Sequence, residues 1–363
     1  MVLLWRLSRP FVFLLPPEQA HGLAITALRS GLVRGRPVED AVLRVCVAGL
    51  DFANPLGMAA GFDKDALVPD ALLNLGFGFS EVGTLTPLPQ AGNPRPRLFR
   101  LSADKAVINR MGFNNQGHEA AYRRLAARKR RGIIGINIGA NKESANRIGD
   151  YVRGIEQFYP VADYFTVNIS SPNTPGLRNL QARDSLRELL DAVLGARAAC
   201  QEKTQRRCPV FLKISPDLSE EGLDDIADVV LSGTLDGLIV SNTTLSRAGL
   251  RDRQAGEAGG LSGVPLFERS TIVLAKMRQR LGVQFPLIGV GGLHDAASAL
   301  EKIRAGADLL QLYSALVYQG VGIANAILRG LVTMCRNDGV GNIGEYRDST
   351  TQQWAARPLL AEK

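Results

Sequence analysis

Eight short apolar segments, each about the length of a β-strand, recur between residues 55 and 314 and constrain the fold more than any other feature. Helix-patterned stretches occupy most of the intervals, for example residues 185–199, 222–231, 269–281 and 295–305. Apolar strands that alternate with helices are typical of a parallel sheet covered on both faces. The segments are PLGMAAG from Pro55, GFSEVGT from Gly78, IIGINIG from Ile133, YFTVNIS from Tyr164, VFLKIS from Val210, GLIVSN from Gly237, PLIGVGG from Pro286 and LLQLYS from Leu309.

Eight such units in about 270 residues predict an α/β fold, a (β/α)8 TIM barrel. A doubly wound open sheet is the alternative, but no GxGxxG motif opens a helix after the first strand. Residues 87–113 and 247–263 are too long to be simple connections, and long loops on a barrel usually belong to the site. Residues 46–52 are predicted to form a hairpin that closes the barrel floor.

The first 36 residues lie outside the repeating pattern and form a small N-terminal helical extension. Residues 2–15 are apolar but fall short of the roughly 20 residues that a membrane-spanning helix needs. From residue 17 the apolar positions recur at helical spacing. Two interpretations stay open. Either this is an amphipathic module on an anionic membrane, with Trp5, Phe11 and Phe13 entering the interface, or it is a helix pair packed against the barrel.

Composition excludes several classes of protein. With 45% hydrophobic and 21% charged residues, the chain is an ordinary globular one rather than a disordered, collagenous or polytopic membrane protein. Its net charge of +8 is compatible with nucleic acid, an anionic membrane or anionic ligands. No CxxC, HExxH or HxH motif occurs, so disulfides, a metal site and a histidine-driven triad are not predicted. The residues concerned are Cys46, Cys200, Cys208 and Cys335, and His21, His118 and His294.

The predicted strand ends carry two lysines, three asparagines and no carboxylate pair. Catalytic groups of α/β barrels lie at these ends. Asparagine matches an O=C–NH–C=O edge, and lysine supplies positive charge to a carboxylate. We interpret the glycines and the serine after the last two strands as a phosphate site rather than as simple tight turns. The residues at the ends are Lys64, Thr84, Asn137, Asn168, Lys213, Asn242, Gly291, Gly292, Tyr313 and Ser314.

The segment NISSPNTPGLR, residues 168–178, is predicted to form a structured flap because two prolines and a glycine shape it. It carries Ser171 and Asn173 over the barrel mouth. Since no histidine lies nearby in sequence, Ser171 is not a triad nucleophile. It either caps a turn or accepts a proton.

These motifs resemble the dihydroorotate dehydrogenase family, and in particular its quinone-dependent, membrane-associated class 2. The matching segments run in order along the chain: AAGFDK (59–64), GNPRPRLFRL (92–101), NRMGFNN (109–115), NISSPNTPGLR (168–178), SNTT (241–244), GGLSG (259–263), GVGG (289–292) and QLYS (311–314). The resemblance implies oxidation of (S)-dihydroorotate to orotate in pyrimidine synthesis. One FMN per chain would accept the hydride, and a ubiquinone-type quinone would accept the electrons.

The resemblance also implies the residues of each site. FMN would be held by Ala60, Gly61, Phe62, Asp63, Lys64, Thr84, Asn137, Asn168, Lys213, Ser241, Gly263, Gly292, Tyr313 and Ser314. Dihydroorotate would be bound by Lys64, Asn109, Arg110, Met111, Gly112, Phe113, Asn168, Asn173, Asn242 and Thr243. The polar end of a quinone tunnel would use His21, Arg29, Arg100 and Tyr313.

Ser171 matches the catalytic base of the family, which removes the C5 proton while hydride passes from C6 to flavin N5. Soluble class 1 members place a cysteine there, so the serine itself indicates class 2. Ser241 stands where many relatives carry threonine, and it preserves the hydroxyl.

The resemblance further implies an organisation and a location. Residues 1–36 would form the membrane and quinone-tunnel module, 37–340 the FMN barrel and 341–363 a C-terminal tail. The protein would be a monomer, peripherally bound to the cytoplasmic face of a bacterial inner membrane with an anionic surface.

Three alternatives remain at the level of the sequence. One is another FMN barrel oxidoreductase, and a second is a class 1 enzyme that uses fumarate or NAD. The third is a basic protein that binds nucleic acid through the arginine cluster at residues 123–131. A solvated helix face explains that cluster better, and no aromatic platform accompanies it, so no nucleic-acid partner is predicted.

Overall fold

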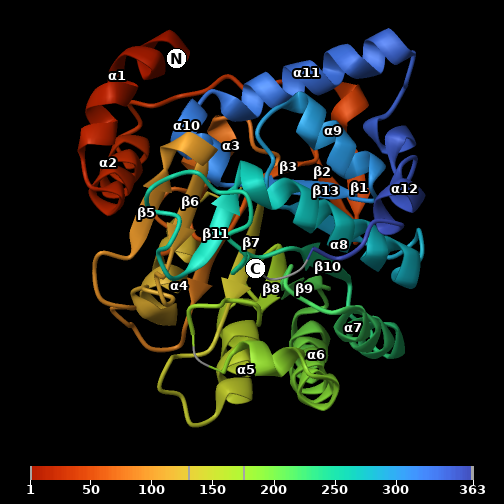
Figure 1. Cartoon of the computed structure of the whole chain (residues 1–363). Coiled ribbons are helices and arrows are strands. Elements are labelled where there is room, and N and C mark those ends of the chain that lie inside the picture. Colours follow the sequence, from red (N-terminus) through yellow and green to blue (C-terminus); the bar gives the residue numbers. More distant parts are fainter. Residues whose placement is uncertain (1, 130, 175, 361–363) are drawn as a thin grey trace.

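The computed structural model, which describes residues 2–129, 131–174 and 176–360, is built around a closed barrel of eight parallel strands (Figure 1). The order around the barrel is β10-β12-β13-β3-β4-β7-β8-β9. Each strand coincides with one of the eight apolar segments, although β4 runs one residue past its segment, so the predicted (β/α)8 barrel is confirmed. The barrel strands are β3 (Leu56–Met58), β4 (Phe79–Leu85), β7 (Ile133–Ile138), β8 (Tyr164–Asn168), β9 (Val210–Ile214), β10 (Gly237–Val240), β12 (Leu287–Val290) and β13 (Leu309–Leu312).

Helices follow the strands and cover the outer face of the barrel. The four helical stretches predicted from periodicity fall on α6, α7, α8 and α9. The strands between these helices are almost entirely buried, which explains their near-continuous apolar sequence. The covering helices are α3 (Pro69–Asn74), α4 (Gly117–Ala127), α5 (Arg147–Phe158), α6 (Arg183–Thr204), α7 (Glu220–Ser232), α8 (Phe267–Leu281), α9 (Ala296–Arg304), α10 (Ser314–Gln319) and α11 (Ile323–Asp338). Short 3₁₀ helices are η1 (Ala41–Leu43), η2 (Ser102–Asp104), η3 (Arg178–Gln181), η4 (Val264–Leu266) and η5 (Ile343–Tyr346).

A hairpin closes the amino-terminal end of the barrel, as predicted. It consists of β1 (Val45–Val47) and β2 (Leu50–Phe52), paired antiparallel. Phe52 packs edge-on against Phe79, the first residue of β4, with ring centroids 5.2 Å apart. Phe79 in turn contacts Tyr164, the first residue of β8. The hairpin therefore supplies the aromatic plug of the barrel floor.

The two long intervals join in one small antiparallel sheet near the opposite end. The first interval contributes β5 (Leu98–Leu101) and β6 (Ala106–Asn109), and the second contributes β11 (Gly260–Gly263). Their order is β11-β6-β5, with Asn109 paired to Gly260. Strand β11 was not predicted, because its glycine-rich sequence has the composition of a loop. Pairing with β6 gives it its extended shape.

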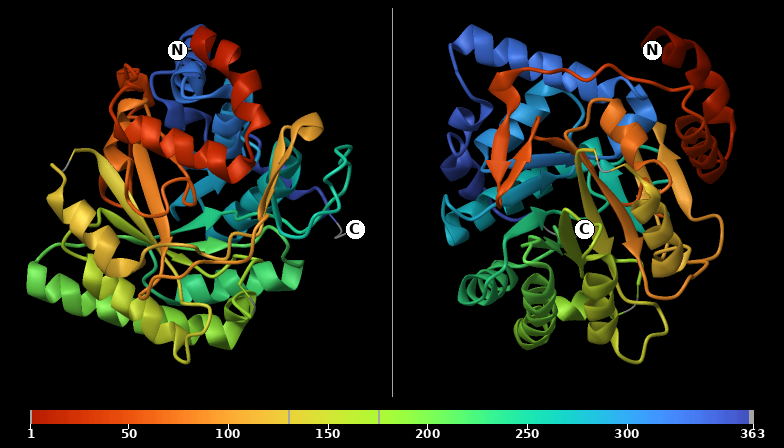
Figure 2. Two further views of the ribbon diagram at one scale, coloured as in Figure 1. Left: turned by 90° about the vertical axis from the view of Figure 1, so that its left-hand side faces the viewer. Right: turned by 180° about the vertical axis from the view of Figure 1, so that it is seen from behind.

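The N-terminal extension forms two helices, α1 (Val2–Leu14) and α2 (Pro17–Arg29). They lie side by side at one edge of the molecule, next to β5 and away from α5, α6 and α7 (Figures 1 and 2). Among their described side chains only Leu28 is buried, so this pair adds little to the central core. Within the described residues, no helix combines the length and apolar character needed to cross a membrane.

The C-terminal segment packs on the outside of the barrel. After η5, helix α12 (Thr351–Ala355) lies against α8, where Trp354 meets Phe267 with ring centroids 6.1 Å apart. The indole N–H of Trp354 donates to Glu301 of α9 at 2.6 Å. These contacts tie the segment to two barrel helices.

Candidate active site

One cavity of about 870 Å³ runs from the carboxyl ends of the barrel strands to the space beneath α1 and α2. It collects nearly all the residues that the sequence singled out, from elements far apart in the chain. Those lining it are His21, Ala60, Gly61, Phe62, Lys64, Thr84, Arg100, Asn109, Met111, Gly112, Phe113, Asn168, Ser171, Asn173, Lys213, Ser241, Asn242, Thr243, Gly263, Gly291, Gly292, Tyr313 and Ser314.

Four of the predicted residues are absent from the described lining, and their side chains have other partners or lie on the surface. Asp63 caps the next turn by accepting from the N–H groups of residues 67 and 68. Arg110 pairs with Glu257 at 2.8 Å. Asn137 lies one layer below the cavity, and Arg29 is exposed. Direct ligand contacts of these residues stay predictions, and the geometry gives the first three supporting positions.

A relay of hydrogen bonds connects the amides at the strand ends. Asn242 donates to Asn168 Oδ1 at 3.2 Å, and Asn168 donates to Thr84 Oγ1 at 2.9 Å. Thr84 donates to Asn137 Oδ1 at 2.6 Å, and Asn137 donates to Glu81 Oε1 at 2.7 Å. Because each amide is fixed at both ends, the side chains facing the cavity have defined orientations.

Glu81 is the residue in this relay that the sequence reasoning missed. It is fully buried in the middle of β4, and its second oxygen accepts from Tyr164, Thr166 and Gln311. The sequence feature that could have identified Glu81 is that it is the single carboxylate inside the apolar segment GFSEVGT. A buried carboxylate must be fully hydrogen-bonded, and here the barrel interior supplies the donors.

Two lysines supply positive charge to the cavity, the half-buried Lys64 and the buried Lys213. Burial lowers the pKa of Lys64 to about 8, although the charges of Asp65 and Glu18 raise it. Burial also lowers the pKa of Lys213, on β9, against the opposing effect of Glu81. Lys64 Nζ donates to the Gly61 carbonyl at 2.5 Å. No side chain or carbonyl in the described part of the chain accepts a hydrogen bond from Lys213 Nζ, which therefore faces the cavity with its donors free.

Two glycines at one end of the cavity, Gly292 after β12 and Gly263 at the end of β11, pack too closely against neighbouring backbone to carry a side chain. A Cβ on Gly292 would stand 2.3 Å from Phe267 Cα, and one on Gly263 would stand 2.5 Å from the Lys105 carbonyl oxygen. The Gly292 N–H has no acceptor within the ranges that the structure describes. Ser314 Oγ lies beside this turn in the lining and donates to Ser262 Oγ at 2.8 Å. Close backbone approach and a free N–H are the features that a phosphate requires.

The flap places Ser171 over the mouth. Ser171 is buried, and its Oγ accepts from the Asn173 N–H at 3.3 Å. Arg178 anchors the flap by donating to the Ser170 carbonyl at 3.3 Å and to the buried Asp217 at 3.2 Å. Ser171 is thus held inside the cavity by contacts on both sides of it.

The turn at residues 109–113 closes the cavity from the side of the small sheet. Asn173 Nδ2 donates to Asn109 Oδ1 at 3.4 Å. Asn93 donates to the carbonyls of Arg110 at 3.0 Å and of Asn173 at 3.3 Å, so it joins this turn to the flap. Phe113 adopts a positive φ of 54°, which the hydrogen bond from Gln90 Nε2 to its carbonyl, at 3.2 Å, helps to hold.

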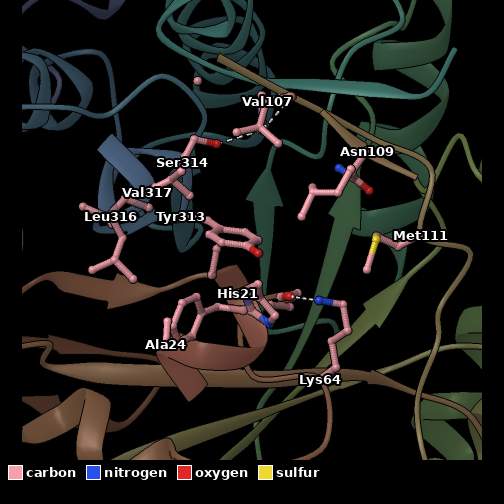
Figure 3. Close-up of a pocket in the computed structure, with 18 of the residues that line it drawn as sticks. His21, Ala24, Lys64, Val107, Asn109, Met111, Tyr313, Ser314, Leu316 and Val317 are labelled. Atoms are coloured by element: carbon pink, nitrogen blue, oxygen red, sulfur yellow. Dashed lines mark hydrogen bonds between the residues drawn. The ribbon is translucent and has the colours of Figure 1, made fainter. Parts of the chain in front are cut away.

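The end of the cavity beneath α1 and α2 is aromatic and aliphatic. His21 packs edge-on against Phe62 at 5.3 Å and lies 6.5 Å from Tyr313, between ring centroids. Burial and the charge of Lys64 lower the pKa of His21 to about 3, so the imidazole is neutral at physiological pH. Figure 3 shows His21, Tyr313, Lys64 and Met111 directed toward one space.

Arg100 reaches this end from β5. It donates to the carbonyls of Phe13 at 3.2 Å and Leu15, at the end of α1, and stacks over the Phe13 ring at 4.6 Å. Its guanidinium therefore satisfies the last carbonyls of α1 and lines the cavity at the same time.

The donors of this cavity fit a flavin mononucleotide. The free Lys213 ammonium faces the strand ends where a ring with acceptor atoms would lie, and the glycine turn with its free N–H stands at the other end for a phosphate. Amides and the second lysine remain for a small acidic heterocycle. The described residues contain no group of His, Cys, Asp and Glu that could hold a metal ion.

Fold and site together define an α/β-barrel enzyme whose chemistry lies at the carboxyl ends of the strands. A family model described as dihydroorotate dehydrogenase matches residues 42–334. A protein from Allorhizobium ampelinum named dihydroorotate dehydrogenase (quinone) is 64% identical over 354 residues, which cover 97% of this chain and 98% of that protein. One of the same name from Brucella ovis is 62% identical and covers 98% of each.

A solved structure of a dihydroorotate dehydrogenase from Eimeria tenella, in complex with ferulenol, is also similar. It is 38% identical, with a TM-score of 0.88 and coverage of 92% of this chain and 95% of that one. The chain therefore belongs to the dihydroorotate dehydrogenase family. Its quinone-dependent members oxidise dihydroorotate in pyrimidine biosynthesis with a quinone as acceptor.

Proposed function

We propose that this protein oxidises (S)-dihydroorotate to orotate at the strand ends, with FMN held in the same cavity, and passes the electrons to a ubiquinone-type quinone beneath α1 and α2. One observation carries the proposal: a single cavity joins a lysine- and amide-lined mouth to an apolar chamber under the N-terminal helices. Such a cavity serves one polar and one apolar substrate on either side of a shared cofactor.

Dihydroorotate is recognised by charge and by its imide edge. The Lys64 ammonium pairs with the carboxylate, and Asn109, Asn173 and Asn242 offer the donors and acceptors that an O=C–NH–C=O edge needs. The relay to Glu81 fixes these amides before the substrate arrives, which lowers the cost of ordering them.

Ser171 is the catalytic base that takes the C5 proton. The Asn173 N–H donates to Ser171 Oγ and favours its deprotonated, proton-accepting state. As the C5 proton leaves, hydride leaves C6 and the C5=C6 double bond of orotate forms. When bound, FMN supplies the hydride acceptor. The flap shields this step from water because Ser171 and Asn173 are part of it.

The groups that would hold FMN lie on or soon after β4, β8, β9, β10, β11, β12 and β13. Lys213, Thr84, Asn168 and Ser241, which line the cavity at the strand ends, would hold the ring. The phosphate would fit between Gly263 at the end of β11, Gly292 after β12 and Ser314 at the start of α10. Tyr313, the residue before Ser314, lines the same cavity and lies 6.5 Å from His21 of α2.

The quinone enters between the N-terminal helices, where His21, Arg100 and Tyr313 form the polar end of the chamber. Quinone-dependent members of the family are membrane-associated in general. Large apolar side chains project from α1 and α2 into solvent, including Phe11, Leu14 and Leu23, which are 72%, 82% and 53% exposed. We place this face in an anionic membrane surface, as a peripheral attachment at the cytoplasmic side of a bacterial inner membrane, with the protein acting as a monomer.

Anaerobic stopped-flow mixing with dihydroorotate tests the proposal. The purified chain is expected to be yellow, with one FMN, and its flavin absorbance should bleach on mixing. The Ser171→Ala variant should keep its FMN and bleach at least 100-fold more slowly, because a positioned general base contributes roughly 10²–10⁴-fold. A colourless chain would refute the function, and equal bleaching rates would remove Ser171 from the role of base.

A further inference from the structure

Lys302, on α9, is a fully buried lysine that the proposed mechanism does not use. Its Nζ donates to Ser270 Oγ at 2.6 Å and to Thr271 Oγ1 at 2.9 Å, both on the first turns of α8. It also lies over the Phe267 ring, 5.0 Å from the centroid. All of these partners are neutral.

No carboxylate in the described part of the chain pairs with Lys302. Lysine is almost never fully buried without an anionic partner, because desolvation of the charge is costly. Burial alone accordingly lowers its pKa well below the ordinary value. A buried cation with neutral protein partners indicates that its counter-charge comes from a ligand.

The position of Lys302 in the fold indicates that this ligand is the phosphate of FMN, an inference that rests on the proposed function. Ser270 Oγ, which accepts from Lys302, lies 3.2 Å from the Gly291 carbonyl oxygen. It is also 2.8 Å from the Leu266 carbonyl and 3.1 Å from that of Phe267, so its one proton is shared among three acceptors. Lys302 therefore stands directly behind the turn that lines the phosphate end of the cavity.

The glycines of GVGG, residues 289–292, leave room for Lys302 and Ser270 behind the turn. A Cβ on Gly289 would stand 2.8 Å from Lys302 Cγ, and one on Gly291 would stand 2.7 Å from Ser270 Oγ. Glycine at these two positions admits the lysine stem and the serine hydroxyl. Because a trans peptide is planar, a Gly291 carbonyl that faces Ser270 directs the Gly292 N–H the opposite way, toward the cavity.

The geometry points to Lys302 as a positioning residue for the cofactor, a positive charge behind the Gly291–Gly292 turn that strengthens binding of a phosphate dianion in front of it. Lys302 does not line the cavity and does not touch the ligand. Its charge acts through the turn, in a dry region where electrostatic interactions are weakly screened.

Competition between FMN and riboflavin tests this inference, because riboflavin has the same ring and lacks the phosphate. Full-length protein is equilibrated with mixtures of the two flavins, and the bound flavins are released and quantified. The Lys302→Met variant should lower the bound FMN-to-riboflavin ratio by about tenfold, because it removes one positive charge from behind the phosphate. Lys302→Gln keeps donors for Ser270 and Thr271 without the charge, and it should show the same loss if the methionine variant folds poorly.

Two controls separate charge from local structure. Lys276→Met removes a different buried lysine, on α8, which forms an ion pair with Glu220 at 2.7 Å and does not line the cavity. This variant should leave the FMN-to-riboflavin ratio unchanged. Ser270→Ala keeps the Lys302 charge and should change the ratio less than threefold. Unchanged ratios in both Lys302 variants, or an equal loss in Ser270→Ala, would overturn the inference. A chain that binds neither flavin would instead refute the proposed function.

Discussion

Replacing Glu18 with glutamine tests how α1 and α2, which we propose as the quinone module, are held to the rest of the protein. Glu18, on α2, accepts from Arg97 at 2.7 Å and 3.2 Å and from Arg95 at 3.1 Å. Arg97 is buried and also donates to the Ala91 and Asn93 carbonyls, in the segment that leads to β5. This pair joins α2 to the segment whose Asn93 holds the flap.

The free-energy cost of Glu18→Gln follows from the hydrogen bonds and the exposure of Glu18. Charge-assisted hydrogen bonds contribute about 1.5–3 kcal/mol each, and glutamine retains part of this. The Glu18 side chain is 21% exposed, so solvent screening reduces the loss to about 1–2 kcal/mol. A loss of about 1.4 kcal/mol corresponds to tenfold more frequent opening of α2.

Hydrogen exchange and separated half-reactions measure this effect. In Glu18→Gln the amides of α2 should exchange about tenfold faster and the KM for quinone should rise several-fold, while anaerobic flavin reduction by dihydroorotate keeps its rate. Arg95→Gln is the matched control, because Arg95 bonds the same carboxylate from a position 73% exposed and should change exchange less than twofold.

The pH dependence gives an independent check. Burial raises the pKa of Glu18, but the hydrogen bonds and charges of Arg97 and Arg95 outweigh it and hold the pKa below its ordinary value. A carboxylate whose pKa is lower in the folded than in the unfolded protein stabilises the folded state at pH values above the unfolded pKa, near 4.3. This stabilisation is lost as the pH falls through the pKa of the folded protein. The difference in α2 amide exchange between Glu18→Gln and the wild type should therefore vanish at acidic pH. Unchanged exchange in α2 at pH 7 would refute the reasoning.

Three further predictions concern the N-terminal module, the substrate lysine and the barrel floor. Removal of residues 1–36 should abolish quinone reduction and detergent dependence while FMN stays bound; intact quinone turnover would contradict the assignment of the module. If the Lys64 ammonium binds the substrate as proposed, kcat/KM for dihydroorotate should fall about tenfold per pH unit above pH 8, because burial lowers the pKa of Lys64 to about 8, and Lys64→Met should remove that limb of the profile. Phe52→Ala should lower the free energy of unfolding by about 3–5 kcal/mol in denaturant titration, because the ring is buried against Phe79, and a change under 1 kcal/mol would exclude the plug.

Much of the fold, and most of the residues that line the cavity, could be predicted from the sequence. The barrel follows from the spacing of the apolar segments, since each must be buried on both faces and each helix must return the chain to the same end. Residues directly after such segments meet at one rim, which is why Lys64, Asn168, Lys213 and Asn242 were identified without coordinates.

Side-chain direction was beyond the sequence. Asp63 and Asn137 lie in the predicted motifs, yet one caps a turn and the other bonds Glu81 below the cavity. Strand β11 depends on pairing with β6, and its glycines carry no local preference for an extended shape. The direction of Asn137 and the shape of β11 depend on partners tens to hundreds of residues away in the sequence.

Local sequence pattern thus determined the order of elements, the end of the barrel that bears the candidate site and the chemical character of its rim. Strand and helix periodicity and the position of a residue at a strand end are properties of neighbouring residues. The tertiary structure alone decided that Glu81 finds four donors, that Glu18 reaches Arg97 and that Lys302 stands behind a glycine turn. The physical reason is that burial and hydrogen bonding of a charged group depend on which distant elements surround it, and that is determined only when the barrel closes.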